Sequence, residues 1–225
     1  MNILRRGFSI MLPGAAAGLF GQTSPPTPPS RLELDLVKDW VGKAHQRKLD
    51  PMSELLKREP NLIHSSWDWG SGDWESALQA AAHTGSREMA LFLLDRGARV
   101  DLFAATMLGQ LNALKIMLDT FPKSIDIRGA HGIPLLSHAV AGEDGSRPVF
   151  EYLLSRRVDV NLQANNGNTA LMMAVQTGQR ETVQTLLRGG ADPNLKAKNG
   201  QTALSLSLKR GDGQVTNLLK EAGAL

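Results

Sequence analysis

The segment from Trp67 to Glu75 concentrates the side chains of this sequence that could do chemistry. Asp68, Asp73 and Glu75 lie among glycines within nine residues. Paired carboxylates can act as general acid and general base where their environments separate their pKa values, and the tryptophan rings beside them would stack on sugar faces. One hypothesis is therefore a glycan or small-molecule binder or hydrolase. The simpler interpretation is a solvated acidic loop.

Three of the four tryptophans, Trp67, Trp69 and Trp74, fall within eight residues of this segment. Tryptophan is enriched at binding hot spots because it contributes a large contact area with little rotamer freedom. These residues are therefore candidates for a protein-binding anchor. The alternative is that they close the N-terminal end of the fold, with one or two of them buried and the rest exposed.

The histidines are spread along the chain, and no two have the His-x-x-x-His spacing of one helix face. They are His45, His64, His83, His131 and His138. Because a metal ion needs convergent ligands, this pattern predicts no metal site. His138 is expected to pack or to make a satisfied hydrogen bond. The sequence also has no Gly-x-Ser-x-Gly elbow, phosphate loop or dinucleotide fingerprint, so we predict no catalytic residue and no cofactor.

A repeated sequence pattern predicts the helices that would position these candidate residues. Residues 166–194 hold a turn, a helix, a Gly stop, a second helix and a second Gly stop, and the pattern recurs 33 residues later. Thr169, Leu171, Gly178 and Gly190 are matched by Thr202, Leu204, Gly211 and Gly223. A fixed period of this length is the signature of a stacked repeat architecture.

The residue types in the repeat explain why it would stack. Each unit carries an apolar stripe that one helix pair cannot bury alone, so neighbouring units must share one continuous core. Thr169 is predicted to cap the first helix through its hydroxyl. Gly178 and Gly190 stand where the two helices end and a positive φ is favourable. Leu171 and Leu204 are predicted to be core residues.

The repeat resembles an ankyrin repeat. The first-helix pattern of that family is present as Gly167-Asn-Thr-Ala-Leu-Met-Met-Ala-Val-Gln-Thr-Gly178, and its return loop as Gly190-Ala-Asp-Pro-Asn194. The resemblance implies an all-α solenoid of about five stacked helix-turn-helix units including caps, over residues 31–225, with hairpin-loop fingers between the units. It also implies non-catalytic binding of another protein through the concave face that the fingers line.

The period and its interruptions divide the chain. We expect an export signal over 1–22, a proline-rich linker over 23–30, N-terminal capping helices over 31–66 and repeats over 67–225. The repeats are placed at about 67–99, 100–130, 131–163, 164–196 and, as the C-terminal cap, 197–225. The 100–130 unit is short, because only 24 residues separate Gly85 from Gly109. It is expected to lack its finger and to leave a notch in the row.

In ankyrin-like proteins, partners usually bind the finger tips and the exposed edge of the first helices. Matching by position, with the tryptophan segment included, gives a candidate protein-binding set of Trp67, Trp69, Asp73, Trp74, Glu75, His83, Thr84, Asn165, Asn166, Asn168, Gln176, Thr177, Lys198, Asn199, Gln201, Lys209 and Arg210. Along this set acids and tryptophans come first, neutral amides next and bases last. Such a polarised surface would orient a partner by complementary charge.

The first 22 residues have the layout of a secretory signal, with a short basic region, an apolar run and a small-residue site. Arg5, Arg6 and Phe8 resemble the Arg-Arg-x-Phe core of a bacterial twin-arginine signal, which a receptor reads as an export address. We therefore expect a periplasmic or otherwise exported bacterial scaffold, inhibitor or protective partner. A cytoplasmic location is the alternative if this segment is not a working signal.

Composition narrows the class of partner. The net charge of +3 falls to +1 once residues 1–30 are set aside, which is a poor electrostatic footprint for nucleic acid. No run of 18 apolar residues is present, so no stable membrane insertion is expected after signal removal. The chain has no cysteine, which excludes disulfides and thiolate chemistry. We expect a monomer that binds another protein.

Overall fold

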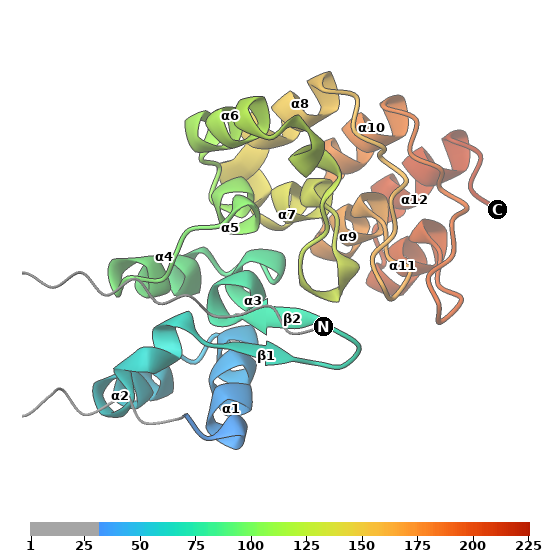
Figure 1. The fold of residues 1–225 in the computed structure, drawn as a ribbon. Coiled ribbons are helices and arrows are strands. Elements are labelled where there is room, and N and C mark those ends of the chain that lie inside the picture. The colour runs from blue at the N-terminus through green and yellow to red at the C-terminus, as the bar shows by residue number, and fades with distance from the viewer. Residues whose placement is uncertain (1–31) are drawn as a thin grey trace, which may run out of the picture. The chain divides into compact units, whose positions relative to one another are not determined.

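Helix pairs that follow one another along the chain build the described part of this protein. The computed structural model describes residues 32–225, which form one unit by their contacts. Residues 1–31 lie outside the described residues, and with them the predicted export signal at Arg5, Arg6 and Phe8 and the predicted linker over 23–30. The twelve α-helices of the described residues form six consecutive pairs (Figure 1).

The first three pairs occupy residues 34–120. The first is α1 (Leu34–His45) with α2 (Leu49–Arg58), followed by the 3-10 helix η1 (Pro60–His64). Strands β1 (Ser66–Asp68) and β2 (Trp74–Ser76) then form a hairpin that leads into α3 (Ala77–His83) and α4 (Arg87–Asp95). The third pair is α5 (Leu102–Met107) with α6 (Leu111–Thr120).

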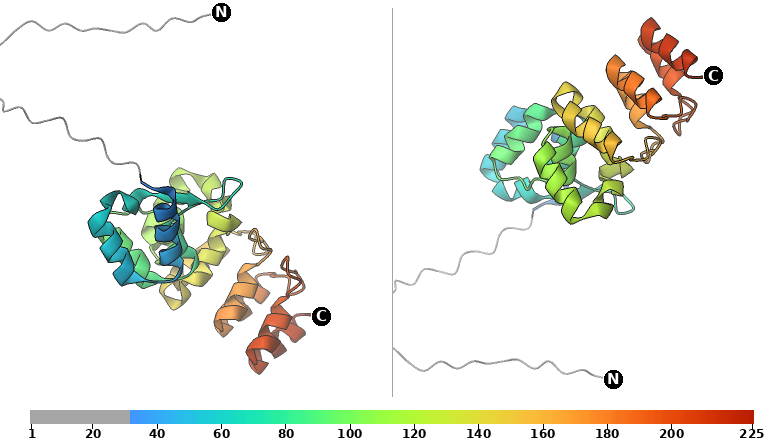
Figure 2. Two further views of the ribbon diagram at one scale, coloured as in Figure 1. Left: turned by 90° about the horizontal axis from the view of Figure 1, so that it is seen from below. Right: turned by 90° about the horizontal axis from the view of Figure 1, so that it is seen from above.

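The last three pairs occupy residues 135–221. The 3-10 helices η2 (Pro122–Asp126) and η3 (Ala130–Gly132) lead into α7 (Leu135–Ala141), and η4 (Glu143–Ser146) leads into α8 (Arg147–Ser155). The remaining helices are α9 (Ala170–Thr177), α10 (Arg180–Arg188), α11 (Ala203–Arg210) and α12 (Gly213–Glu221). The last two pairs lie side by side in both views of Figure 2.

The first helix of each pair packs against the first helix of the next pair, in the order α1, α3, α5, α7, α9 and α11. Each second helix packs against its own first helix, and all the pairs contribute to one continuous hydrophobic core. An apolar stripe on each helix is therefore buried by the neighbouring unit. The predicted all-α solenoid of helix-turn-helix units is confirmed.

Local chemistry in the 166–194 unit agrees with the prediction from its residue types. The Thr169 hydroxyl accepts a hydrogen bond from the backbone N–H of Met172 at 3.2 Å, so Thr169 is the N-cap of α9. Gly178 ends α9 with φ of 77°, and Gly190 follows α10 with φ of 89°. Any other residue at either position would have to adopt a left-handed backbone conformation, which glycine adopts without steric cost.

The connection between α4 and α5 is the shortest link between two units in the described chain. Helix α4 ends at Asp95, and α5 begins at Leu102. The Asp101 carboxylate caps α5 by accepting a hydrogen bond from the Ala104 N–H at 2.7 Å. The six residues between the helices contain no strand and no 3-10 turn. This unit therefore has no finger, and we call the missing finger position the gap. The β1–β2 hairpin and the loop that contains η3 meet across it through Asp73 and His131, so the expectation of an open notch in the row was wrong.

The loops after the gap are joined by hydrogen bonds that repeat with the period of the sequence. The Asn161 amide donates to the carbonyl of Gly190 at 3.2 Å, and the Asn194 amide, 33 residues later, donates to the carbonyl of Gly223 at 3.0 Å. Backbone bonds also link each finger to the next, from Asn165 N–H to the His131 carbonyl and from Lys198 N–H to the Asn166 carbonyl, both at 2.9 Å. The fingers therefore form a connected row.

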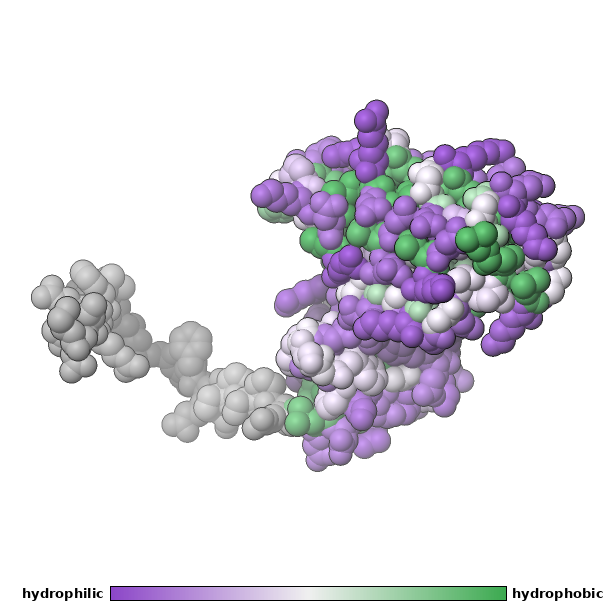
Figure 3. Space-filling model, turned by 90° about the vertical axis from the view of Figure 1, so that its right-hand side faces the viewer, coloured by the Kyte–Doolittle hydropathy of each residue, from purple (hydrophilic) through white to green (hydrophobic). Residues whose placement is uncertain are grey.

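The face at the C-terminal end of the array carries both hydrophobic and hydrophilic side chains. Figure 3 shows this face, with hydrophobic groups gathered in its upper part and hydrophilic groups around them. Leu208 is exposed there, and Leu204 is only partly buried. Leu204 was predicted to be core, but it is only partly buried, in a helix that packs mainly against α9 and α12. None of the described helices has the length and apolar character needed to cross a membrane.

Truncating Leu171 and Leu204 separately tests this difference. Leu171 is 1% exposed, so Leu171→Ala should lower the free energy of unfolding by about 2–5 kcal/mol, the usual cost of a buried leucine with its cavity. Leu204→Ala should cost less than about 2 kcal/mol because water already reaches that side chain. Urea unfolding followed by circular dichroism measures both values. Equal losses would contradict the partial burial of Leu204.

Candidate functional site

The β1–β2 hairpin is the first finger, in the position predicted for the first hairpin loop. Its strands are antiparallel, with Trp67 opposite Glu75 and Asp68 opposite Trp74. Successive side chains in a strand point to opposite faces. Accordingly, Glu75 is completely buried, whereas its neighbour Trp74 is 61% exposed. The hairpin packs beside α1 and α3 (Figure 1). The Glu75 carboxylate faces His45 of α1 and His83 of α3.

Glu75 is the centre of a group of three histidines from three other elements. His83 is the last residue of α3, and its Nε2 lies 2.8 Å from Glu75 Oε1. His45 is the last residue of α1, and its Nε2 lies 3.2 Å from Glu75 Oε2 and 3.1 Å from His83 Nε2. His131, in η3, places its Nε2 3.4 Å from Glu75 Oε2. We call these four residues the histidine cluster.

Two neighbours orient the cluster. Asp73 accepts hydrogen bonds from the backbone N–H of His131 at 2.6 Å and from its ring Nδ1 at 2.8 Å. Trp69 donates its indole N–H to Glu75 Oε2 at 2.7 Å. Asp73 and Trp69 both belong to the turn of the first finger. The finger therefore holds the loop around His131 across the gap left by the missing finger.

The charges in the cluster stabilise one another. Burial by itself would raise the pKa of Glu75, but hydrogen bonds and charge from His45 and His83 outweigh it and lower the pKa to about 2. Burial also acts to lower the pKa of His45, but the hydrogen bond and charge of Glu75 and the Val41 carbonyl raise it above its ordinary value. Glu75 is therefore held as a carboxylate.

This carboxylate is a poor general acid. A carboxylic acid that protonates a leaving group at neutral pH needs a raised pKa, whereas the pKa of Glu75 is lowered to about 2. Asp73 is occupied by His131, and Asp68 accepts a hydrogen bond from the Gly70 N–H at 2.9 Å. The geometry therefore argues against glycan hydrolysis by these three acids. The exposed ring of Trp74 leaves sugar stacking available at this finger.

The predicted tryptophan and acid contacts need two corrections. None of Trp67, Trp69 and Trp74 is fully buried: Trp67 is partly buried against the core, and the other two are exposed. The expectation of one or two buried tryptophans was wrong, because the hairpin lies on the side of the array. The prediction that the exposed charge gradient begins with acids is also wrong. Glu75 is buried, and the carboxylates of Glu75 and Asp73 both face histidines.

The reason given for expecting no metal site was wrong as well. Three of the five histidines converge although 38 residues separate His45 from His83 and 48 separate His83 from His131. Sequence spacing on one helix could not reveal this. The structure shows that His45 and His83 each stand two residues before a residue with positive φ, Arg47 and Gly85, but Arg47 in place of a glycine concealed the match in the sequence. They therefore occupy equivalent positions in consecutive first helices.

His83 also lines a second feature, which we call the concave groove. The groove has a volume of about 520 Å³ and is lined by Arg47, His83, Thr84, Gly85, Arg87, Ala141, Gly142, Glu143, Asp144, Gly145, Met173, Gln176 and Thr177. The predicted binding residues His83, Thr84, Gln176 and Thr177 are therefore brought together from two units that lie far apart in the sequence. Two arginines and two acids give the groove mixed charge.

The remaining predicted residues lie on the fingers and at the end of α11. Asn165, Asn166, Lys198, Asn199 and Lys209 are exposed. Several of the amides shape their own turns: Asn166 Oδ1 accepts from the Asn168 N–H at 2.9 Å, and Asn199 Oδ1 accepts from the Gln201 N–H at 3.1 Å. Arg210 donates to the Gln176 carbonyl at 2.9 Å. The structure does not bring these residues into the histidine cluster.

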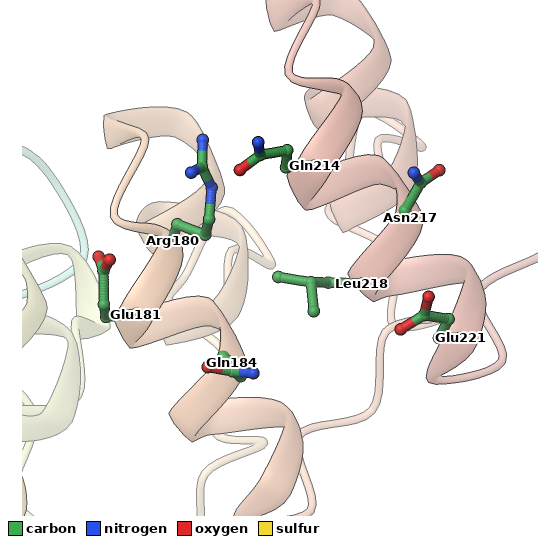
Figure 4. A pocket seen from close by; sticks show the side chains of 7 residues that line it. All are labelled: Arg180, Glu181, Gln184, Gln214, Asn217, Leu218 and Glu221. Carbon is green, nitrogen blue, oxygen red and sulfur yellow. The ribbon is translucent and has the colours of Figure 1, made fainter.

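A separate pocket lies between the second helices α10 and α12. It has a volume of about 320 Å³ and is lined by Arg180, Glu181, Gln184, Gln214, Asn217, Leu218 and Glu221 (Figure 4). Figure 4 shows Leu218 projecting between the two helices, with polar side chains around it. None of the predicted binding residues lines this pocket.

Comparison with known proteins identifies the repeats. Residues 136–224 match the family described as ankyrin repeats (3 copies). None of the curated proteins compared with the chain matches it. The matched segment runs from α7 through α12, so the similarity to ankyrin repeats covers these three helix pairs. Ankyrin repeats generally mediate protein–protein interaction and are typically non-catalytic.

His138, the buried histidine outside the cluster, confirms the prediction of a satisfied hydrogen bond. It is 1% exposed, its Nδ1 lies 3.1 Å from the Pro134 carbonyl, and its ring centre lies 4.8 Å from that of Phe103. Burial lowers its pKa to about 4, from 6.5 in the unfolded chain. Below pH 6.5 the unfolded chain therefore takes up a proton that the folded chain refuses until about pH 4.

His138 should accordingly destabilise the fold as the pH falls from 6.5 toward 4, by roughly 3 kcal/mol in all. His138→Gln removes this titration, so its free energy of unfolding should fall less over the same range than that of the natural chain. Urea unfolding at several pH values measures the slope. His64→Gln, at an exposed position, is the matched control and should keep the natural slope. Identical slopes for both variants would contradict the assignment.

Proposed function

We propose that this ankyrin-repeat chain is a non-catalytic binding module, an exported bacterial scaffold, inhibitor or protective partner that holds another protein on its concave, finger-lined face. The concave groove is the observation that carries the proposal. It joins Thr84 at the end of α3 with Gln176 and Thr177 at the end of α9. A surface assembled from distant units suits a folded partner better than a small ligand.

The charge of the groove indicates what kind of surface would fit it. Arg47 and Arg87 line it together with Glu143 and Asp144. Arg87 is already partly engaged, since it donates to the Leu108 carbonyl at 3.0 Å. A partner with paired acidic and basic side chains would complement this lining, and charge complementarity contributes to orientation and on-rate more than to affinity.

The finger row adds a second, basic contact region. Lys198 and the amides of Asn165, Asn166 and Asn199 are exposed on the last two fingers, and Lys209 is exposed in the last turn of α11. Because the acids of the first finger face histidines, the exposed charge of the predicted binding set is basic. We therefore propose a partner that presents an acidic patch to the last fingers. Higher salt should weaken this contribution.

Affinity capture from a bacterial envelope extract, with the full chain as bait, tests the binding surface. Gln176→Arg combined with Thr177→Arg should abolish recovery of a specific partner, because two large cations would fill the groove. Gln184→Arg combined with Gln214→Arg adds the same charge to the pocket between α10 and α12 and should retain the partner. If both double variants recover the same amount of partner, the groove is not the binding site. Binding of saccharides but of no protein would favour the sugar-stacking alternative at Trp74.

Export by the twin-arginine route is a separate part of the proposal. It is supported by Arg5, Arg6 and Phe8 and by the apolar run that follows them. Replacing both arginines by lysine keeps the charge but removes the guanidinium groups. The double variant should remain in the cytoplasm of a bacterial host, whereas the natural chain should reach the periplasm, as cell fractionation would measure. Unchanged export of the variant would exclude the twin-arginine route.

A further inference from the structure

We propose that His45, Glu75, His83 and His131 bind one divalent transition-metal ion, and that Zn²⁺ is the ion whose preferences they fit best. Each residue offers one ligand atom, and these four atoms all lie within 4.8 Å of one another. Imidazole nitrogen and carboxylate oxygen are standard Zn²⁺ ligands, and four protein ligands with no position left open are typical of a structural site.

The distances between the ligand atoms suit a tetrahedral shell. Zn–N and Zn–O bonds of about 2.0–2.1 Å place neighbouring ligand atoms of a tetrahedron about 3.3–3.4 Å apart. Glu75 Oε2 lies 3.2 Å from His45 Nε2 and 3.4 Å from His131 Nε2, and the two nitrogens of His45 and His83 lie 3.1 Å apart. His83 Nε2 lies 2.8 Å from the other Glu75 oxygen, Oε1, and no two of the ligand atoms are more than 4.8 Å apart. Shifts of the partly exposed histidine side chains would bring the shorter and the longer separations to the tetrahedral value.

The outer nitrogens of two histidines determine which inner nitrogen is free. His45 Nδ1 lies 3.1 Å from the Val41 carbonyl, which only accepts, so this nitrogen carries the proton. His131 Nδ1 faces the Asp73 carboxylate at 2.8 Å in the same way. In the neutral rings, both Nε2 atoms therefore turn a lone pair toward Glu75. A histidine held by a carboxylate or a carbonyl behind it is the usual arrangement of a metal ligand.

Those lone pairs cannot face the carboxylate of Glu75 without a cation between them. Glu75 Oε2 lies 3.2 Å from His45 Nε2 and 3.4 Å from His131 Nε2, and two acceptors at such distances repel each other. Either protons on the rings or a metal ion must supply the positive charge. A single divalent ion would satisfy all four ligand atoms at once, whereas protons would leave cationic rings in contact. The experiment below distinguishes the two.

Burial and access also suit a bound ion. Glu75 is fully buried, while the side chains of His45 and His131 are 25% and 33% exposed. The ion could therefore enter from solvent and would then be enclosed on the side of the core. Trp69 donates to Glu75 and places its ring edge-on to His45, with the ring centres 5.8 Å apart, so it covers part of the opening.

A bound ion would add a link between η3 and three elements, α1, β2 and α3, that already pack together. The ligands come from α1, β2, α3 and η3, so the ion would tie the N-terminal helix pair and the first finger to the loop beyond the gap. His83 also lines the concave groove. The proposed metal would therefore fix one wall of the surface to which we assign partner binding, although the metal site does not depend on that assignment.

Metal uptake by the untagged full chain, freed of metal by chelator, tests the proposal. Zn²⁺ competition against a chromophoric chelator should show one tight site per chain, and Co²⁺ should give the visible d–d bands of a four-coordinate nitrogen and oxygen site. His131→Gln and Glu75→Gln should each weaken Zn²⁺ binding by at least about 100-fold. Asp73→Asn should weaken it about 10- to 100-fold, as expected for a residue that orients a ligand.

His64→Gln is the control, because it removes an exposed histidine away from the cluster and should leave binding unchanged. Circular dichroism shows whether each variant remains helical. If a variant fails to fold, the Co²⁺ spectrum of the natural chain still decides the question. No uptake of Zn²⁺ or Co²⁺ by the natural chain, or equal binding by the His131→Gln and His64→Gln chains, would overturn the proposal and assign the cluster to protonated histidines around Glu75.

Discussion

The burial of each helix pair against its neighbours is the constraint on which the rest of this structure depends. A pair such as α9–α10 presents apolar side chains on more than one side, and only the adjoining pairs can remove them from water. The first helices must therefore lie in one row. That row fixes where each first helix ends, and so it places His45, His83 and Thr177 on the same side of the array.

The missing finger turns this regular array into one with a distinctive site. Where fingers are present in consecutive units, each bonds to the next through its backbone, as Asn165 does to His131. The 100–130 unit supplies no finger, so His131 meets the first finger directly and bonds to Asp73, 58 residues earlier in the sequence. The side chains of Asp73 and His131, both titratable, take the place of the backbone bond that joins fingers elsewhere in the row. The short unit thus allows His131 to join His45, Glu75 and His83.

Sequence reasoning succeeded where the chemistry is local and repeated. The Thr169 cap, the Gly178 and Gly190 stops and the stacking of units all follow from residue types at fixed offsets, because each acts within one unit. It failed for Leu204, whose burial depends on whether another unit follows. It also failed for the histidine cluster, which needs four elements to meet. His45 and His83 occupy equivalent positions in successive units, but Arg47 in place of a glycine conceals this in the sequence, and the approach of His131 across the gap has no sequence signal.

His83 connects the two features that distinguish this array from a plain stack of repeats. One edge of its ring contacts Glu75, while the residue also lines the concave groove next to Thr84. Whatever supplies positive charge to the cluster therefore also sets the position of a groove side chain. Because Glu75 is buried and bonded to Trp69 as well, a change in its partners would be transmitted to the turn of the first finger. The groove and the finger are thus both connected to Glu75, one through His83 and the other through Trp69.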